Sequence, residues 1–95
     1  METIVVKVTK EKNWAGNEYL IYSADNYGKI AEVDYATKYR KLPRVYSLTN
    51  EVVDDYICFS SIPSALVGAE TICRGYFLDR GLDVTFNYPK TIKVK

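Results

Sequence analysis

The chain has 95 residues, of which 47% are hydrophobic and 26% are charged. This length allows one modest hydrophobic core, so the sequence predicts a single domain over residues 1–95. The composition excludes disordered, collagen-like and low-complexity classes. Thirteen Lys and Arg residues against twelve Asp and Glu residues leave a formal charge of +1, which provides no global attraction to nucleic acids or anionic membranes.

The N-terminal sequence and the cysteines bear on the compartment. Residues 1–7 (METIVVK) contain no basic region followed by a long apolar stretch, so neither a signal peptide nor a membrane span is expected. Cys58 and Cys73 belong to no CxxC pair, which argues against a secreted disulfide scaffold and against zinc or redox chemistry. Both are expected to be reduced, buried thiols. A location in the cytoplasm, or in the cytoplasm of a host, is expected.

Strand-like patterns dominate the N-terminal third of the chain. Residues 3–9 are rich in β-branched side chains and predict a first strand. Residues 10–17 break this pattern with charges, Asn and Gly, and predict a loop. Residues 18–24 form a second apolar and aromatic run. The turn formers at 25–28 predict a hairpin in which Gly28 adopts a positive φ.

The middle of the chain gives mixed signals. Apolar and polar side chains alternate over residues 31–40, which predicts a third strand rather than a helix. Leu42-Pro43 ends this strand, because proline cannot donate a ladder hydrogen bond. Residues 45–48 predict a short strand. Residues 51–59 fit a helical stripe and a buried strand equally well, so both interpretations stay open for this element.

One main helix is predicted over about residues 62–80. Ser60 and Ser61 precede an Ile-Pro pair, a helix-entry signal that combines a capping hydroxyl with a proline in the first turn. Apolar residues then recur at spacings of three and four, and Gly81 provides a left-handed stop. A competing interpretation makes residues 71–78 a strand.

The C-terminal residues complete the predicted fold. Residues 82–87 predict a strand, residues 88–90 a turn and residues 91–95 a closing strand. The predicted fold class is therefore α+β. It consists of a mainly antiparallel sheet of about five to six strands covered by the one helix.

Small residues line one face of the predicted helix. Ala65, Gly68, Ile72 and Gly75 follow one another at spacings of three, four and three. Glycine costs about 1 kcal/mol relative to alanine inside a helix, so close packing is expected to compensate. We expect this face to pack against the sheet, with a dimer contact to a second copy of the chain as the less favoured alternative.

The chain contains no histidine, which removes most catalytic and metal-binding chemistry. Ser–His and Cys–His pairs are impossible, and His-containing zinc sites are excluded. On a strand, Glu32 and Asp34 would share a face about 7 Å apart, a spacing suited to acid–base chemistry or a hard metal ion. We favour the interpretation that they form a solvated strand face, since no third ligand lies nearby. No enzymatic activity, and no catalytic, cofactor-binding or metal-binding residues, are expected.

Nine tyrosines are about three times the ordinary number for this length. Tyr35, Tyr39 and Tyr76 fall on the apolar faces of their predicted elements and are expected in the core. Trp14 and Tyr27 lie in or beside predicted loops, where burial is less assured. Tyrosine gives rigid contact area at a low entropic cost, so aromatic residues outside the core are candidates for binding.

A basic segment follows the third predicted strand. Residues 38–44 read KYRKLPR, with four positive charges and no acid. Basic groups interleaved with aromatic rings suit single-stranded nucleic acid, whereas the alternative is a solvated turn that protects an edge strand. The candidate binding surface comprises Lys10, Lys12, Trp14, Tyr27, Lys38, Arg40, Lys41, Arg44 and Tyr46.

The predicted function is binding rather than catalysis. We expect a small non-enzymatic interaction module that occupies a partner's surface and self-associates, the partner being another protein or a second copy. Such domains are common among viral and mobile-element accessory or inhibitor proteins, which is an association only. The alternative is weak, salt-sensitive binding of single-stranded DNA or RNA. No cofactor, membrane contact or small-molecule substrate is expected.

Overall fold

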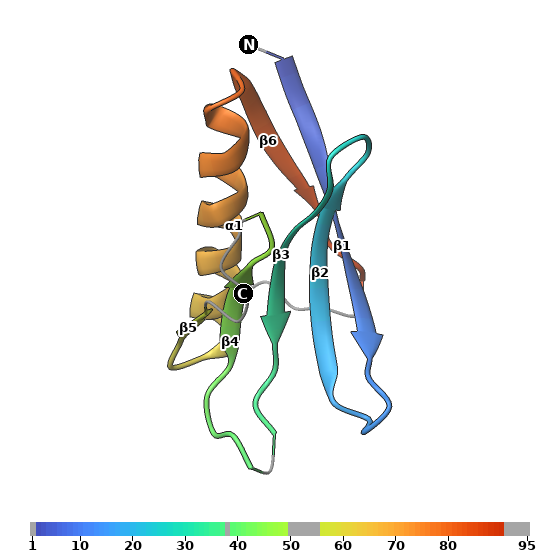
Figure 1. Cartoon of the computed structure of the whole chain (residues 1–95), viewed down its shortest axis with the longest axis vertical. Helices are drawn as coiled ribbons and strands as arrows, with labels where there is room; N and C mark the ends of the chain where they lie inside the picture. Colours follow the sequence, from blue (N-terminus) through green and yellow to red (C-terminus); the bar gives the residue numbers. More distant parts are fainter. Residues whose placement is uncertain (1, 38, 50–55, 91–95) are drawn as a thin grey trace.

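The computed structural model describes residues 2–37, 39–49 and 56–90. These residues form a six-stranded sheet with one helix packed on it (Figure 1). In chain order, the elements are β1 (Glu2–Lys12), β2 (Glu18–Ala24), β3 (Gly28–Asp34), β4 (Arg44–Ser47), β5 (Tyr56–Cys58), α1 (Ile62–Leu78) and β6 (Leu82–Asn87). The predicted α+β class is confirmed, with a mixed, mostly antiparallel sheet.

The strands lie in the order β5-β4-β3-β2-β1-β6. The pairs from β1 to β5 are antiparallel, whereas β1 and β6 are parallel. This parallel pair follows from the connections. The helix runs back along the sheet after β5, and the turn that follows α1 reverses the chain again, so β6 points the same way as β1 (Figure 1).

The core lies between α1 and one face of the sheet. Alternate residues of the central strands point at the helix, and Leu20, Val33 and Val45 are cross-strand neighbours on this face. Leu66 and Phe77 of α1 are buried in the same core. The described residues place no helix on the opposite side of the sheet, which we call the open face (Figure 1).

The first two strands and their turns agree closely with the sequence pattern. β1 continues to Lys12, beyond the predicted end at residue 9, so the loop before β2 is shorter than expected. The hairpin between β2 and β3 has Gly28 at φ +77° as predicted, and Asn26 also adopts a positive φ of 69°. The predicted strand over residues 82–87 is confirmed as β6.

The prediction that the third strand reaches residue 40 is wrong. β3 ends at Asp34, and a turn closed by a hydrogen bond of 2.7 Å from Thr37 N to Arg40 O follows it. The Thr37 hydroxyl accepts from the Tyr39 and Arg40 N–H groups at 3.2 and 3.0 Å. These local bonds compete with the sheet ladder and turn the chain away from it. Tyr39, expected in the core, is therefore 88% exposed.

The element predicted over residues 51–59 is a strand where the structure describes it. Tyr56–Cys58 form β5, and the remaining positions of the ambiguous stretch up to residue 55 lie outside the described residues. β5 is an edge strand whose three residues are all exposed. The expectation of a buried thiol is therefore wrong for Cys58 and confirmed for Cys73. The closing strand predicted at 91–95 also lies outside the described residues.

The helix begins and ends where its capping residues predict. Ser61 is the N-cap, and its hydroxyl accepts from the Ser64 N–H at 3.3 Å. The helix ends at Leu78, and Gly81 follows at φ +72°. The alternative strand over residues 71–78 is therefore wrong. The described part of the chain holds no helix with the length and apolarity needed to cross a membrane.

The small-residue face of α1 packs mostly within the chain. Ala65 is fully buried in the core, and Ile72 packs against the core. The ring of Phe59 rests against Gly68, where a β-carbon would overlap it. Gly75 is exposed and has no neighbour that a β-carbon would meet. A dimer contact through this face stays a prediction.

The segment after β6 is tied to the helix by a chain of polar contacts. Tyr88 OH donates to Glu70 Oε2 at 2.5 Å, so the buried Tyr22 OH, 2.8 Å away, donates to Tyr88. Arg74 pairs with the other oxygen of Glu70 at 3.3 Å. Burial is the main reason that the pKa values of Tyr22 and Tyr88 lie well above the ordinary value for tyrosine.

Candidate functional site

Two connections lie side by side at one end of the sheet. The turn between β1 and β2 covers residues 13–17, and the connection between β3 and β4 covers residues 35–43 (Figure 1). Trp14 at the first of these is 97% exposed, the highest value among the large apolar residues that the structure describes. With the 88% exposed Tyr39, two large aromatic side chains lie in solvent at this end of the molecule.

The turn that carries Trp14 is held by its own hydrogen bonds. Asn13 Oδ1 accepts from the N–H groups of Ala15 and Asn17 at 2.9 and 3.1 Å. Asn13 N–H also donates to Asn17 O at 3.0 Å, and Gly16 sits at φ +81°, a region that favours glycine. The exposure of Trp14 is therefore a property of an ordered turn and not of a loose chain end.

The second connection is anchored through Tyr35 and Arg40. Tyr35 N–H donates to Glu18 O at 3.2 Å, which ties the end of β3 to the start of β2. Arg40 Nη2 donates to Tyr35 O at 2.6 Å and so folds the connection back onto that point. The half-buried Arg40 guanidinium thus has a structural role in this loop.

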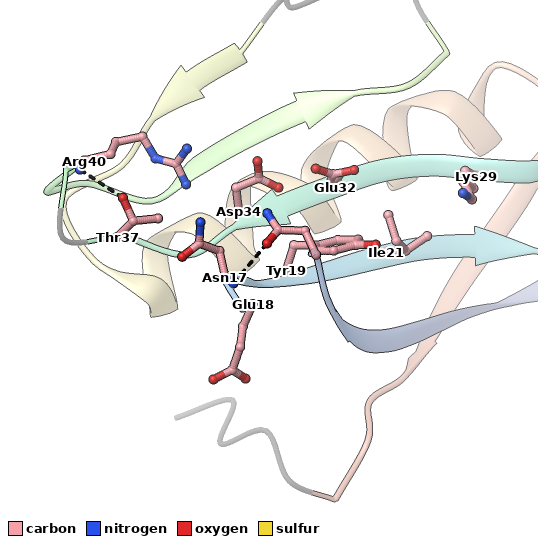
Figure 2. Close-up of a pocket in the computed structure, with 10 residues that line it drawn as sticks. Asn17, Glu18, Tyr19, Ile21, Lys29, Glu32, Asp34, Thr37 and Arg40 are labelled. Atoms are coloured by element: carbon pink, nitrogen blue, oxygen red, sulfur yellow. Dashed lines mark hydrogen bonds between the residues drawn. The ribbon is translucent and has the colours of Figure 1, made fainter. Parts of the chain in front are cut away.

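A polar pocket of about 300 Å³ lies between these loops and the open face. Figure 2 shows Glu32 and Asp34 next to each other on β3 at this pocket, with Arg40 and Lys29 toward its opposite ends. Ile21 and Tyr19 of β2 are the cross-strand partners of the two acids. The lining residues are Asn13, Asn17, Glu18, Tyr19, Ile21, Lys29, Glu32, Asp34, Thr37 and Arg40.

Asp34 changes the acidity of Glu32. Burial, followed by a hydrogen bond to Asp34 and by the charge of Asp34, raises the pKa of Glu32 to about 8. Asp34 Oδ1 is fully enclosed, and among the described residues no N–H or O–H group donates to it. The hydrogen bond between Glu32 and Asp34 needs a proton on one of the two carboxyl groups, because ionised carboxylates only accept. Glu32 is therefore mostly protonated at neutral pH.

Tyr19 lies in the same electrostatic environment as Glu32 and Asp34. Burial, followed by the charges of Glu11, Glu32 and Asp34, raises the pKa of its phenol. Glu11 is the cross-strand partner of Tyr19 on β1. The loop end of the open face therefore holds three carboxyl groups near one tyrosine. The sequence spacing of Glu32 and Asp34 indicated a shared face, but their partial burial depends on neighbouring strands and was not predicted.

The structure places the predicted basic residues in different surroundings. Lys10 pairs with Glu18 at 2.6 Å, and its ammonium group lies 5.8 Å from the centre of the Tyr35 ring. The Arg44 guanidinium stacks 4.2 Å from the centre of the Tyr56 ring, and a hydrogen bond with Tyr46 raises the pKa of Arg44. Both cations are thus engaged within the chain.

The other members of the predicted surface divide into two groups. Lys12 and Lys41 are exposed and lie at the same end of the sheet as Trp14. Tyr46 lies on the open face beside Tyr56, with ring centres 5.5 Å apart. Tyr27 lies at the opposite end, in the β2–β3 hairpin, where its ring packs 4.9 Å from the Phe77 ring centre. Lys38 lies outside the described residues.

Two further observations bear on the chemistry of the site. Among the described residues, no three His, Cys, Asp or Glu side chains, those around Tyr19 included, are arranged so that they could hold a metal ion. Comparison of the chain with protein families, curated proteins and solved structures found no match. Any statement on function therefore depends on the geometry of the loops and of the open face.

Proposed function

We propose that this chain is a non-enzymatic protein-binding module that acts by occupying a surface of its partner. Its binding surface is the loop surface, which we define as Lys12, Trp14, Tyr39, Arg40, Lys41 and Leu42. Trp14 carries the proposal, because an ordered turn holds it almost fully in water. Tryptophan, tyrosine and arginine are the residue types that most often anchor protein interfaces.

The order of the turn favours binding over chance exposure. A turn whose backbone is already fixed loses little backbone entropy on binding, so more of the contact energy of its side chain appears as affinity. Indole also buries a large apolar area and keeps one N–H donor for the partner. The exposed Leu42 and the cations of Lys12 and Lys41 provide an apolar neighbour and a polar rim around such an anchor.

The free thiols support the proposed location. Neither Cys58 nor Cys73 forms a disulfide, and Cys58 is exposed on the edge strand β5. An exposed free thiol is compatible with a reducing compartment. We therefore propose that the module works in the cytoplasm, either of its own organism or of a host.

The test compares partner recovery by matched variants. Trp14→Ala removes the proposed anchor, and Leu78→Ala removes an apolar side chain that is 63% exposed at the end of α1, away from the loop surface. Proteins cross-linked to the tagged chain should be recovered with the wild type and with Leu78→Ala, and lost with Trp14→Ala.

The recovered partner, once purified, allows a direct measurement. Trp14→Ala should weaken its affinity at least about 30-fold, the equivalent of the 2 kcal/mol that defines an interface hot spot. Equal affinities for wild type and Trp14→Ala would overturn the proposal. Sedimentation of the wild type at several concentrations addresses the expected self-association, and a monomer at every concentration would exclude a second copy as the partner.

A second candidate function is binding of single-stranded nucleic acid. Lys12, Arg40 and Lys41 lie on the same connections as the exposed Trp14 and Tyr39, and phosphate-binding cations beside stacking rings are typical of such proteins. Fluorescence anisotropy with single-stranded and duplex oligonucleotides at low and high salt tests this candidate. Absence of binding at low salt would exclude it, since contacts to phosphates are strongest there.

A further inference from the structure

Building on the proposed function, we propose that Glu32 and Asp34 regulate the loop surface by sharing a proton. With the proton present, the two side chains hold each other at the floor of the polar pocket. When the proton is lost, the carboxylates repel each other and the loops that form the pocket lose order. The pair would then act as a pH-sensitive element between neutral and mildly alkaline conditions.

The argument begins with the position of the pair between the two loops. The pocket that contains both acids is also lined by Asn13 and Asn17 from the first loop and by Thr37 and Arg40 from the second. Asn13 is the residue whose side chain closes the Trp14 turn. A change in spacing between the two carboxyl groups would therefore displace the pocket-lining residues of the two loops that carry the proposed binding residues.

Asp34 also connects directly to the second loop along the chain. It is the last residue of β3, and the next residue, Tyr35, holds two of the bonds that anchor the loop. These are the bond from Tyr35 N–H to Glu18 O and the bond from Arg40 to Tyr35 O. Displacement of Asp34 by repulsion would strain both bonds.

Charged groups of both signs surround the pair. The groups that face or flank the pair are Glu11 on β1, Tyr19 on β2, Lys29 on β3, Arg40 in the β3–β4 connection, and Arg44 and Tyr46 on β4. Glu11 adds to the repulsion, whereas Lys29 opposes it. Arg40 Nη2 donates to Tyr35 O and the Arg44 guanidinium stacks on Tyr56, while the buried Nε atoms of both arginines have no hydrogen-bond partner among the described residues. Within the described part of the chain, no ion pair joins either arginine to Glu32 or Asp34.

The acidity of Glu32 supports this geometry. Its pKa is raised to about 8 by burial and by Asp34, so the proton leaves the pair in the range where the proposal needs it. Below that range a protonated Glu32 donates to the Asp34 carboxylate, and above it that donor is lost, while Asp34 Oδ1 has no other partner among the described residues. The loss of a buried hydrogen bond and the gain of a like charge thus occur in the same step.

The experiment follows the pair and the loop separately by NMR. The side-chain carboxyl carbon of Glu32 should titrate with a midpoint near 8, and the solvent exchange of the Tyr35 amide reports the loop. Magnetisation transfer measures this exchange in the wild type and in Glu32→Gln, which keeps a neutral donor beside Asp34 at every pH. A Cys58→Ser background removes the exposed thiol from both proteins.

The expected result is a difference that develops with pH. At pH 6.5 the protection of the Tyr35 amide should be equal in the two proteins, and at pH 9 it should be about tenfold lower in the wild type. No titration of Glu32 near 8, or equal protection at pH 9, would overturn the switch. Neither result bears on the proposed function, because the comparison of Trp14→Ala with the wild type tests that function at a single pH.

Discussion

The contact between Phe59 and Gly68 gives a prediction whose sign is unusual for a helix glycine. Glycine inside a helix is less favourable than alanine by up to about 1 kcal/mol, so Gly→Ala normally stabilises. At Gly68, however, a β-carbon would overlap Phe59 Cζ and lie 3.0 Å from Cε1 and Cε2. The ring points its Cζ end at the helix. The backbone of Phe59 is fixed, because its N–H donates to Pro43 O at 3.0 Å.

The magnitude follows from two opposing effects. Overpacking of this kind costs about 1–3 kcal/mol, and the helix gains back up to about 1 kcal/mol from the alanine. We expect Gly68→Ala to lower the free energy of unfolding by about 1 kcal/mol. For a domain of this size, that change corresponds to a decrease in Tm of about 4–8 °C.

Gly75 provides the matched control within the same helix. An added β-carbon there meets nothing within 4 Å, so Gly75→Ala should raise the free energy of unfolding by about 0.5–1 kcal/mol. Urea unfolding followed by circular dichroism measures both variants. In a Phe59→Leu background, Gly68→Ala should become stabilising. Equal stability of the two alanine variants would refute the close contact between Phe59 and the helix.

Three further predictions concern single hydrogen bonds and the carboxyl pair. The pKa of Glu32 rises from 4.5 to about 8 on folding, so its stabilising contribution is complete below about pH 4.5 and is lost by about pH 8. This pKa difference sets an upper limit of about 5 kcal/mol on the contribution of Glu32 to the free energy of unfolding, and solvent screening reduces it to about 1–2 kcal/mol. Urea unfolding between pH 5 and pH 9 should show the free energy of unfolding of the wild type falling with pH and that of Glu32→Gln lacking this fall. An identical fall in both proteins would contradict the prediction. Ser61→Ala should cost about 1 kcal/mol because Ser64 N–H loses its acceptor, and an unchanged urea midpoint would argue against the cap. Tyr88→Phe should cost about 1–3 kcal/mol because the buried Tyr22 hydroxyl loses its acceptor, and restoring much of that loss with Tyr22→Phe would confirm the pairing.

The parts of the fold that depend on local chemistry were predictable from the sequence. Gly28 and Gly81 mark turns because only residues that tolerate positive φ fit there, and both adopt it. Ser61 marks the helix start because its hydroxyl replaces a missing backbone acceptor. In each case the residue and its partner lie within a few positions of each other.

The errors arose where distant or competing bonds decide the structure. Alternation continues past Asp34, but the Thr37 hydroxyl and the anchor at Glu18 end the strand, so the pattern placed Tyr39 in the core. Cys58 looked like a core residue because its neighbours are apolar. Its exposure results from the position of β5 at the edge of the sheet, which only the strand order reveals.

The candidate site was predictable in its residues and not in its arrangement. The sequence indicated Trp14 and the basic segment as surface features, and it indicated that Glu32 and Asp34 share a face. It contained no local signal that β2 and β4 would flank the two acids closely enough to favour a shared proton. Pairing across strands sets that environment, and the residues involved are up to 15 positions apart in the β2–β3 pair, as for Tyr19 and Asp34.

The open face also couples the two proposals thermodynamically. A partner that covers the loop surface and the adjoining pocket would remove water from Glu32, and removing water disfavours the charged form. Binding would then raise the pKa of Glu32 above its value in the free chain, so complex formation would take up protons near pH 8 and above. Linkage requires the reciprocal effect, in which affinity for the partner falls as the pH rises through this range. A partner that contacts only the Trp14 turn would leave the pocket hydrated, and its affinity would not follow the charge of Glu32. The pH dependence of affinity, compared between wild type and Glu32→Gln, therefore reports how far the partner extends across the sheet.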